Sequence, residues 1–295
     1  MAQGLASMNV QDIHVVVTSN FAKTVAQMTG NTSYTADRGG GMVAAKTVSG
    51  PEGSVVVVNY DVLPSRPPAD VQRILAHEGG HVLIDARSTE ETSGNRDSTE
   101  TDWEWCLKCL GAQAIVELRI ERSLAELGYA AVEGTEPSSV EHSLLITNVE
   151  VVNAVIDPAS DDPAHLQAAL LTTLNHVTKM LAYIAAPLAA GQSIFSPALL
   201  SLEGRANWVD YVAPTWQQRT AFWSSIPSVT EPIPVRPWRT TLRDSAMLEQ
   251  ALLSNFGFAF STLSDGRYGF YRTSSDDTFT QRLQRACKQT DTQPE

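Results

Sequence analysis

The chain has 295 residues, 43% of them hydrophobic and 18% charged, a balance that indicates a folded globular protein rather than a disordered one. Its formal net charge is −12 with no basic stripe, which argues against nucleic acid or an anionic membrane as the main partner. Three cysteines do not indicate a disulfide framework, and no stretch has the roughly 20 apolar residues of a membrane span, so we expect a cytoplasmic protein without a membrane partner.

The N-terminal part of the chain combines strands with short turns. Runs of β-branched residues predict strands at 13–18 and 55–60, and the segment 42–48, which follows a glycine-rich turn, is predicted to be another strand. The run VVVVNY at 55–60 is the strongest strand signal in the chain. A short helix is predicted over residues 21–28, ending at Gly30, and the glycine-rich segment 39–41 is expected to turn.

Two long helices are predicted next. An apolar run preceded by proline predicts a helix from Pro68 to Asp85, because proline is well placed at a helix start. The polar segment 86–99 is expected to be an exposed loop. In that loop Ser98 or Thr99 is expected to cap a second helix, which continues to Gly128, a natural helix stop.

The C-terminal half is predicted to be mainly helical. It follows a linker at 131–139 and stays helical to about residue 226. The later elements are a proline-rich segment at 227–237, a helix at 244–255, a hairpin at 257–272 and a loose polar tail after Thr273. We therefore expect an α+β protein with a domain at 1–130 and a mostly helical domain at 140–295.

The pentapeptide HEGGH at residues 77–81 is the strongest functional signal. His77 and His81 are four residues apart, so on a helix both imidazoles leave the same face. Zinc bound in this way lowers the pKa of a water molecule to about 7, and the neighbouring Glu78 is placed to accept the proton. The sequence therefore predicts a Zn²⁺ site with Glu78 as general base.

Two glycines lie inside this predicted helix. Gly79 and Gly80 each cost roughly 1 kcal/mol relative to alanine in a helix interior. Their presence suggests that another element packs very closely against this turn, and a crossing helix that bears a third metal ligand is one candidate.

The second long helix offers that ligand. At 100° per residue, Glu117 and Glu121 fall on the same face as its apolar residues, whereas Arg119 and Lys108 fall on the side expected to be solvated. Two buried carboxylates one turn apart are unfavourable unless a cation compensates their charge. A zinc ion held by the two histidines would do so.

The same helix contains Cys106 and Cys109, which have the spacing of a redox CxxC motif. Both are in the middle of the helix rather than at its N-terminus, where the pKa of a thiol falls. We expect two packed thiols rather than a redox pair.

HEGGH followed 36 residues later by Glu117 resembles the gluzincin metallopeptidases, and most closely their compact minigluzincin group, which includes bacterial anti-repressor peptidases. The resemblance covers roughly residues 40–130. It implies a zincin-like domain with a small sheet, an HExxH helix and a third-ligand helix bearing an ExxxD pattern. By this resemblance Glu117 is the third zinc ligand and Glu121 orients a histidine by a hydrogen bond.

The chain departs from the family pattern in ways that leave alternatives open. Glu121 stands where the family has aspartate, so the roles of Glu117 and Glu121 can be exchanged. Glu100 follows His81 by 19 residues, the spacing of the third ligand in larger gluzincins, and is a weaker candidate. Asp85, one turn after His81, is either a residue that orients a ligand or only a helix end.

The expected activity is hydrolysis of a protein or peptide substrate, bound along the edge of strand 55–60 or its neighbour. Two alternatives remain. One is a zinc hydrolase that acts on amides other than peptides, and the other is a regulatory or binding protein that retains a zinc site.

Overall fold

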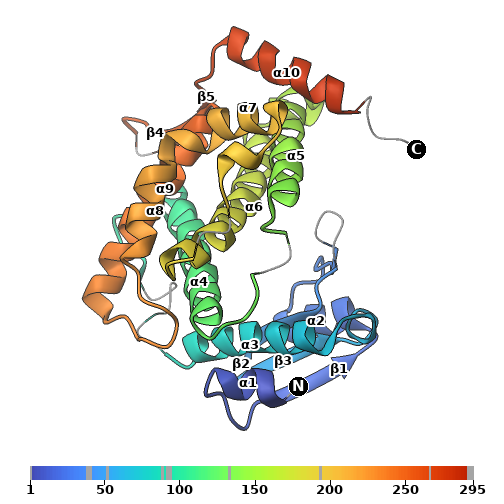
Figure 1. Ribbon diagram of the computed structural model, residues 1–295. Helices are drawn as coiled ribbons and strands as arrows, with labels where there is room; N and C mark the ends of the chain where they lie inside the picture. The colour runs from blue at the N-terminus through green and yellow to red at the C-terminus, as the bar shows by residue number, and fades with distance from the viewer. Residues whose placement is uncertain are drawn as a thin grey trace. The chain divides into compact units, whose positions relative to one another are not determined.

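The computed structural model describes residues 2–37, 42–50, 53–87, 90, 95–131, 134–192, 195–265 and 267–290 (Figure 1). They form an α+β protein that is mostly helical, with one three-stranded sheet and one two-stranded sheet. The expected α+β class is confirmed at this level. The turn expected at 39–41 lies outside the described residues.

The chain divides into two compact units, each assembled from three stretches of sequence. Unit 1 consists of Met1–Gly94, Arg119–Ala130 and Pro227–Trp238, and unit 2 consists of Asn95–Leu118, Ala131–Ile226 and Arg239–Glu295. One boundary, after Ala130, coincides with the start of the expected linker. Another crosses the continuous helix α4 (Asp102–Glu126) between Leu118 and Arg119.

Unit 1 is built on a three-stranded sheet. Its strands are β1 (His14–Thr18), β2 (Ala45–Gly50) and β3 (Gly53–Asn59), in the order β1-β3-β2. The central strand β3 pairs in parallel with β1 and antiparallel with β2. The strand expected from residue 42 begins later, at Ala45, because Met42 forms only an isolated bridge with Asp37.

Helices cover both faces of this sheet. Helix α2 (Phe21–Thr29) packs Phe21 and Val25 against Val48 and Val57 on one face, and ends at Gly30 in the left-handed conformation that favours glycine. Helix α3 (Pro68–Asp85) packs against β2 and β3. It contacts Thr47 and Ser49 of β2, which flank Val48 in the strand and whose side chains therefore point to the opposite face of the sheet.

Helix α3 has the bounds predicted from the sequence, beginning at Pro68 and ending at Asp85. The short helix α1 (Ala2–Ser7) packs along it. The 3₁₀ turn η1 (Leu63–Ser65) precedes it, after β3.

Unit 2 is mainly helical, as the sequence indicates. Besides the first part of α4, its elements are α5 (Pro137–Ile156), η4 (Pro158–Asp161), α6 (Pro163–Ala189), η5 (Pro197–Leu199), α7 (Leu202–Tyr211), α8 (Ala213–Ser224), most of α9 (Val235–Phe256), the hairpin β4 (Phe258–Thr262) and β5 (Tyr268–Arg272), and α10 (Asp276–Thr290). The predicted hairpin is confirmed. Among the described residues, every helix is too short or too polar to traverse a lipid bilayer.

Several predicted boundaries in the second half are wrong. Helix α5 begins inside the expected linker, and α9 begins well before residue 244, because both can start at or near a proline. The tail expected to be loose after Thr273 forms α10 instead. This helix is anchored by Arg282, which is 4% exposed and donates hydrogen bonds to the last carbonyls of α9 at Phe256 (2.6 Å) and Asn255 (2.7 Å).

The start of α4 also differs from the prediction. Neither Ser98 nor Thr99 caps it. Instead the backbone N–H of Thr101 donates to Glu104 Oε2 at 2.8 Å, and the N–H of Glu104 lies 3.4 Å from Thr101 Oγ1. This reciprocal pair is a capping box, a T-x-x-E pattern that is visible in the sequence two to three residues beyond the expected cap.

Candidate metal centre

Helix α3 brings the two histidines of HEGGH together. The Nε2 atoms of His77 and His81 are 3.2 Å apart, and the two ring centroids are 5.0 Å apart. Two nitrogens that bind one tetrahedral zinc at about 2.0–2.1 Å are roughly 3.3 Å from each other. The pair therefore already has the separation that a shared zinc ion requires.

Glu117 on α4 completes a possible ligand set. His77, His81 and Glu117 each have one potential ligand atom within 4.8 Å of the other two. Among the described residues, this is the one cluster of three or more such side chains that could hold a metal ion. The Glu117 carboxylate is 8% exposed, and the hydroxyl of Tyr183 donates to its Oε2 at 3.1 Å. To reach zinc-ligand spacing, the carboxylate has to approach the histidines by at most roughly 1.5 Å.

Glu121, one turn further along α4, orients His77 instead. Its Oε1 is 2.8 Å from His77 Nδ1, and Arg73 pairs with its Oε2. A proton on Nδ1 that is shared with Glu121 leaves the lone pair of His77 on Nε2, the atom that faces His81. This geometry agrees with Glu117 as the ligand and Glu121 as the orienting residue rather than with the exchanged roles. The assignment itself stays a prediction.

No protein-family model, no curated protein and no solved structure matches this chain. The resemblance to the gluzincins therefore rests on the residues of the motif and their spacing.

The two glycines of HEGGH lie at close helix contacts. A Cβ atom on Gly80 would be 2.7 Å from Cγ1 and 2.8 Å from Cγ2 of Ile120, which stands between Glu117 and Glu121 on α4. A Cβ atom on Gly79 would be 3.3 Å from Cβ of Met8, beside α1. The structure confirms that a crossing helix, α4, packs closely against this turn. That α4 bears a metal ligand stays a prediction.

Glu78 is held against the sheet. Its carboxylate Oε2 accepts a hydrogen bond from the backbone N–H of Thr47 at 2.5 Å and lies 2.7 Å from the Thr47 hydroxyl. The side chain of Glu78 is therefore buried at 6% exposure without being left unsatisfied.

Asp85 ties the end of α3 to the sheet instead of orienting a histidine. It accepts hydrogen bonds from the hydroxyls of Ser49 (2.5 Å) and Ser54 (3.0 Å). Of the two roles left open for Asp85 by the sequence, the helix-end role is the one its contacts match.

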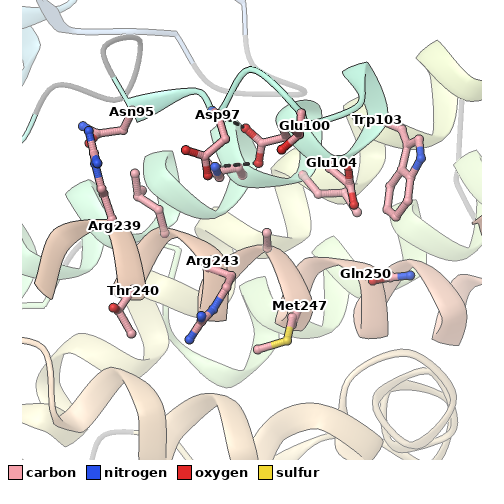
Figure 2. Close-up of a pocket in the computed structure, with 15 residues that line it drawn as sticks. Asn95, Asp97, Glu100, Trp103, Glu104, Arg239, Thr240, Arg243, Met247 and Gln250 are labelled. Atoms are coloured by element: carbon pink, nitrogen blue, oxygen red, sulfur yellow. Dashed lines mark hydrogen bonds and ion pairs between the residues drawn. The ribbon is translucent and has the colours of Figure 1, made fainter. Parts of the chain in front are cut away.

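Glu100, the weaker candidate for the third ligand, lies in a different place. It pairs with Lys108, Nζ to Oε1 being 2.5 Å, in a groove of about 440 Å³ between the first part of α4 and α9 (Figure 2). Glu100 does not belong to the ligand group around His77. The expectation that Lys108 is solvated is wrong, because Lys108 pairs with Glu100 and is only 6% exposed.

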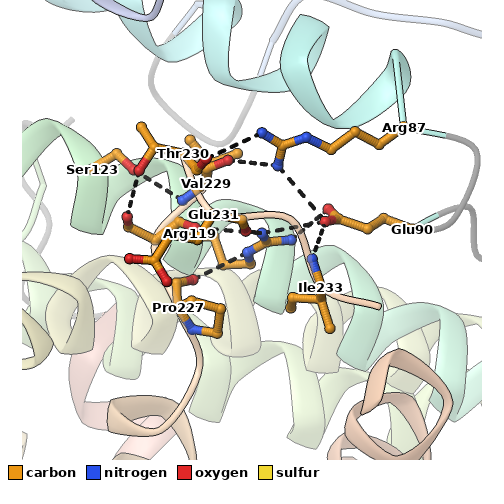
Figure 3. Close-up of polar contacts among 10 residues, drawn as sticks. Arg87, Glu90, Arg119, Ser123, Pro227, Val229, Thr230, Glu231 and Ile233 are labelled. Carbon is orange, nitrogen blue, oxygen red and sulfur yellow. Dashed lines mark hydrogen bonds and ion pairs between the residues drawn. The ribbon is translucent and has the colours of Figure 1, made fainter. Parts of the chain in front are cut away.

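Arg119 was also expected to face solvent and is instead fully buried. It donates to Glu90 Oε2 at 2.6 Å and to the backbone oxygen of Pro227 at 3.1 Å (Figure 3). Burial lowers the pKa of Arg119, and the hydrogen bond and charge of Glu90 oppose that shift. The expectation fails because the proline-rich segment beginning at Pro227, together with Glu90, covers this side of α4.

Two residues that contact the site, Arg73 and Tyr183, are not among those predicted from the sequence. Arg73, which pairs with Glu121, stands four residues before His77 on α3, so its helical spacing was an available signal. Tyr183 reaches Glu117 from α6, 66 residues later in the chain, and no local pattern indicates that contact.

Cys106 and Cys109 are free and half-buried on α4. Burial raises the pKa of both thiols, with Asp102 adding to the shift at Cys106. Thiols that keep their protons are poor nucleophiles, which agrees with packing rather than redox chemistry.

Proposed function

We propose that this chain is a zinc-dependent hydrolase that cleaves peptide bonds. The observation that supports the proposal most strongly is the pair of Nε2 atoms on His77 and His81, 3.2 Å apart, with Glu121 on the remote nitrogen of His77. If the two histidines were unrelated residues on a surface helix, there would be no reason for a buried carboxylate to hydrogen-bond to the Nδ1 atom of His77. Glu117 supplies the third ligand in this proposal.

The donor set suits zinc better than magnesium or calcium. Two imidazoles and one carboxylate form the His₂Glu set of catalytic zinc sites, which leaves one position open. Magnesium and calcium prefer sites made wholly of oxygen atoms, and thiolate ligands are absent from this group. A cation would also compensate the charge of Glu117, which is only 8% exposed, whereas Glu121 already pairs with Arg73.

The side chains of the site have separate roles in the proposed reaction. A bound zinc ion supplies Lewis acidity, which polarises the scissile carbonyl and makes water more acidic. Glu78 takes a proton as the water oxygen bonds to the carbonyl carbon. It then gives that proton to the departing nitrogen as the C–N bond breaks, which yields a carboxylic acid and an amine.

A peptide is the favoured substrate because the sheet offers an edge. The sequence left open whether β3 or its neighbour forms this edge. The first possibility is wrong, because β3 pairs with a strand on each side. Its neighbour β2 is at the edge, and an extended peptide can add to an edge strand through backbone groups other than the Thr47 N–H, which donates to Glu78.

The test combines metal content with two substitutions. Wild-type protein should bind about one zinc per chain and cleave a mixture of unstructured peptides. The variant Glu78→Gln should keep the metal and lose cleavage, and His77→Ala should lose both. Wild-type protein that does not take up zinc in stoichiometric amount would overturn the proposal.

The same variants separate the two alternatives. A regulatory or binding protein that retains the zinc site keeps its cellular activity in Glu78→Gln. A zinc amide hydrolase of another kind cleaves small formyl or acetyl amides in a Glu78-dependent manner and leaves peptides intact.

A further inference from the structure

Alternate residues of strand β2 direct their backbone N–H groups toward β3 and toward the open edge of the sheet. The oxygen of Ala44, just before β2, accepts from the N–H of Asn59 at 2.8 Å, so the backbone groups of residues 44, 46, 48 and 50 point toward β3. The backbone N–H groups of residues 45, 47 and 49 therefore point away from β3, toward the open edge. Because β2 is an edge strand, no neighbouring strand in the described sheet receives them.

The middle one of these three N–H groups is taken by Glu78. Thr47 contributes both its N–H, 2.5 Å from Oε2, and its hydroxyl, 2.7 Å from the same oxygen. The hydroxyl is also 3.0 Å from the backbone oxygen of Glu78. Both contacts end on Oε2, and among the described residues no other hydrogen bond reaches the Glu78 carboxylate.

We infer that Thr47 is a positioning residue for the general base, an inference that rests on the function proposed above. A buried carboxylate needs hydrogen bonds to remain stable, and Thr47 provides them through Oε2. This leaves Oε1 as the oxygen that accepts the proton from water and passes it to the departing nitrogen. A glutamate side chain held in this way does not lose rotamer freedom during the reaction.

The clamp differs from a general support of the helix. Helix α3 is tied to the sheet independently by Asp85, which accepts hydrogen bonds from the hydroxyls of Ser49 and Ser54. Removal of the Thr47 hydroxyl leaves these bonds and the strand pairing in place. Ser49, two residues along the same strand, is therefore a matched control.

Steady-state kinetics of the zinc-loaded full chain tests the catalytic part of the inference. Thr47→Val keeps the N–H and the β-branched shape and loses the hydroxyl, so kcat should fall by about tenfold while KM and zinc content stay unchanged. Thr47→Ser should restore kcat, and Ser49→Ala should resemble wild type. A Thr47→Val enzyme with kcat within about twofold of wild type would overturn the role of Thr47 while leaving the proposed function intact.

Amide hydrogen exchange of the metal-free protein tests the clamp without any activity. The Thr47 N–H should exchange slowly in wild type, although it lies on a sheet edge, and at least about tenfold faster in Glu78→Ala. The Val48 amide, which points toward β3, provides the internal reference. Equal exchange of the Thr47 amide in both proteins would overturn the clamp itself. A wild-type protein that shows the clamp but binds no zinc would refute the proposed function, and with it the general-base role, while the clamp itself would stand.

Discussion

Replacement of Gly80 by alanine tests the helix contact that underlies the metal centre. The new Cβ would stand 2.7 Å from Cγ1 and 2.8 Å from Cγ2 of Ile120, whereas carbon atoms in favourable contact are about 3.5–4.0 Å apart. Ile120 or its helix must therefore retreat by roughly 1 Å. Because Ile120 is between Glu117 and Glu121 on α4, the retreat moves both carboxylates away from the histidines.

The size of the effect follows from two opposing terms. Overpacking of a core position costs about 1–3 kcal/mol. Alanine improves helix propensity by about 1 kcal/mol relative to glycine. We therefore expect Gly80→Ala to lower the free energy of unfolding of metal-free protein by at most about 2 kcal/mol. Zinc affinity should fall on the order of tenfold or more, because ligand orientation is disturbed.

Urea denaturation and a zinc competition titration measure the two quantities. Gly79→Ala is the control: its Cβ would be 3.3 Å from Cβ of Met8, so only a small adjustment is needed and zinc affinity should be unchanged. The double variant Gly80→Ala with Ile120→Ala makes room for the new methyl group and should recover part of the zinc affinity. If Gly80→Ala binds zinc as tightly as wild type, the close contact does not position the ligands and the reasoning is refuted.

Three further predictions concern buried groups. Glu121→Gln should weaken zinc binding by about 10–100-fold with His77 intact, measured by competition with a chelator, and an unchanged affinity would contradict the orienting role. Arg119→Met removes the closer of the two arginines that pair with the buried Glu90 and leaves Arg87 at 3.7 Å, so it should cost about 3 kcal/mol of stability in urea, whereas adding Glu90→Leu should recover part of that loss. Burial raises the pKa of Tyr211 to about 12. The folded protein thus holds this proton longer than the unfolded chain, so stability should fall as the pH rises from about 10 toward 12, and Tyr211→Phe should remove that part of the decline.

Local signals in the sequence predict helix α3 and the hairpin β4–β5 well. Helix α3 has the predicted ends, since Pro68 starts it and the polar residues after Asp85 stop the apolar pattern. The hairpin β4–β5 is also predicted correctly, from two short apolar runs with turn residues between them. These elements depend on neighbours in the sequence, which a single chain displays.

Other features depend on contacts between distant residues. The helical periodicity of α4 predicts that Arg119 faces solvent. This prediction is wrong because the segment after Pro227 covers that side of the helix, and no local pattern in the sequence shows this contact. Helix α10 was expected to be a loose tail for the same reason: its amphipathic pattern is short, and Arg282 anchors it to the end of α9.

The candidate metal centre divides in the same way. The spacing of His77 and His81 in the motif places both on one face of a helix. The low helix propensity of Gly80 indicates, from the sequence alone, that another helix crosses close to this turn. Thr47 and Tyr183 carry no such signal. They reach the site from a strand 31 residues before Glu78 and from a helix 66 residues after Glu117.

The two glycines of α3 also have a consequence for the order of folding. Together they cost the isolated helix about 2 kcal/mol, enough to prevent a helix of this length from forming alone in water. The turn that holds the histidines is therefore expected to form only when Met8 and Ile120 pack against it. Residues near the N-terminus contribute no atom to the ligand group, yet they belong to the cooperative unit whose folding creates it.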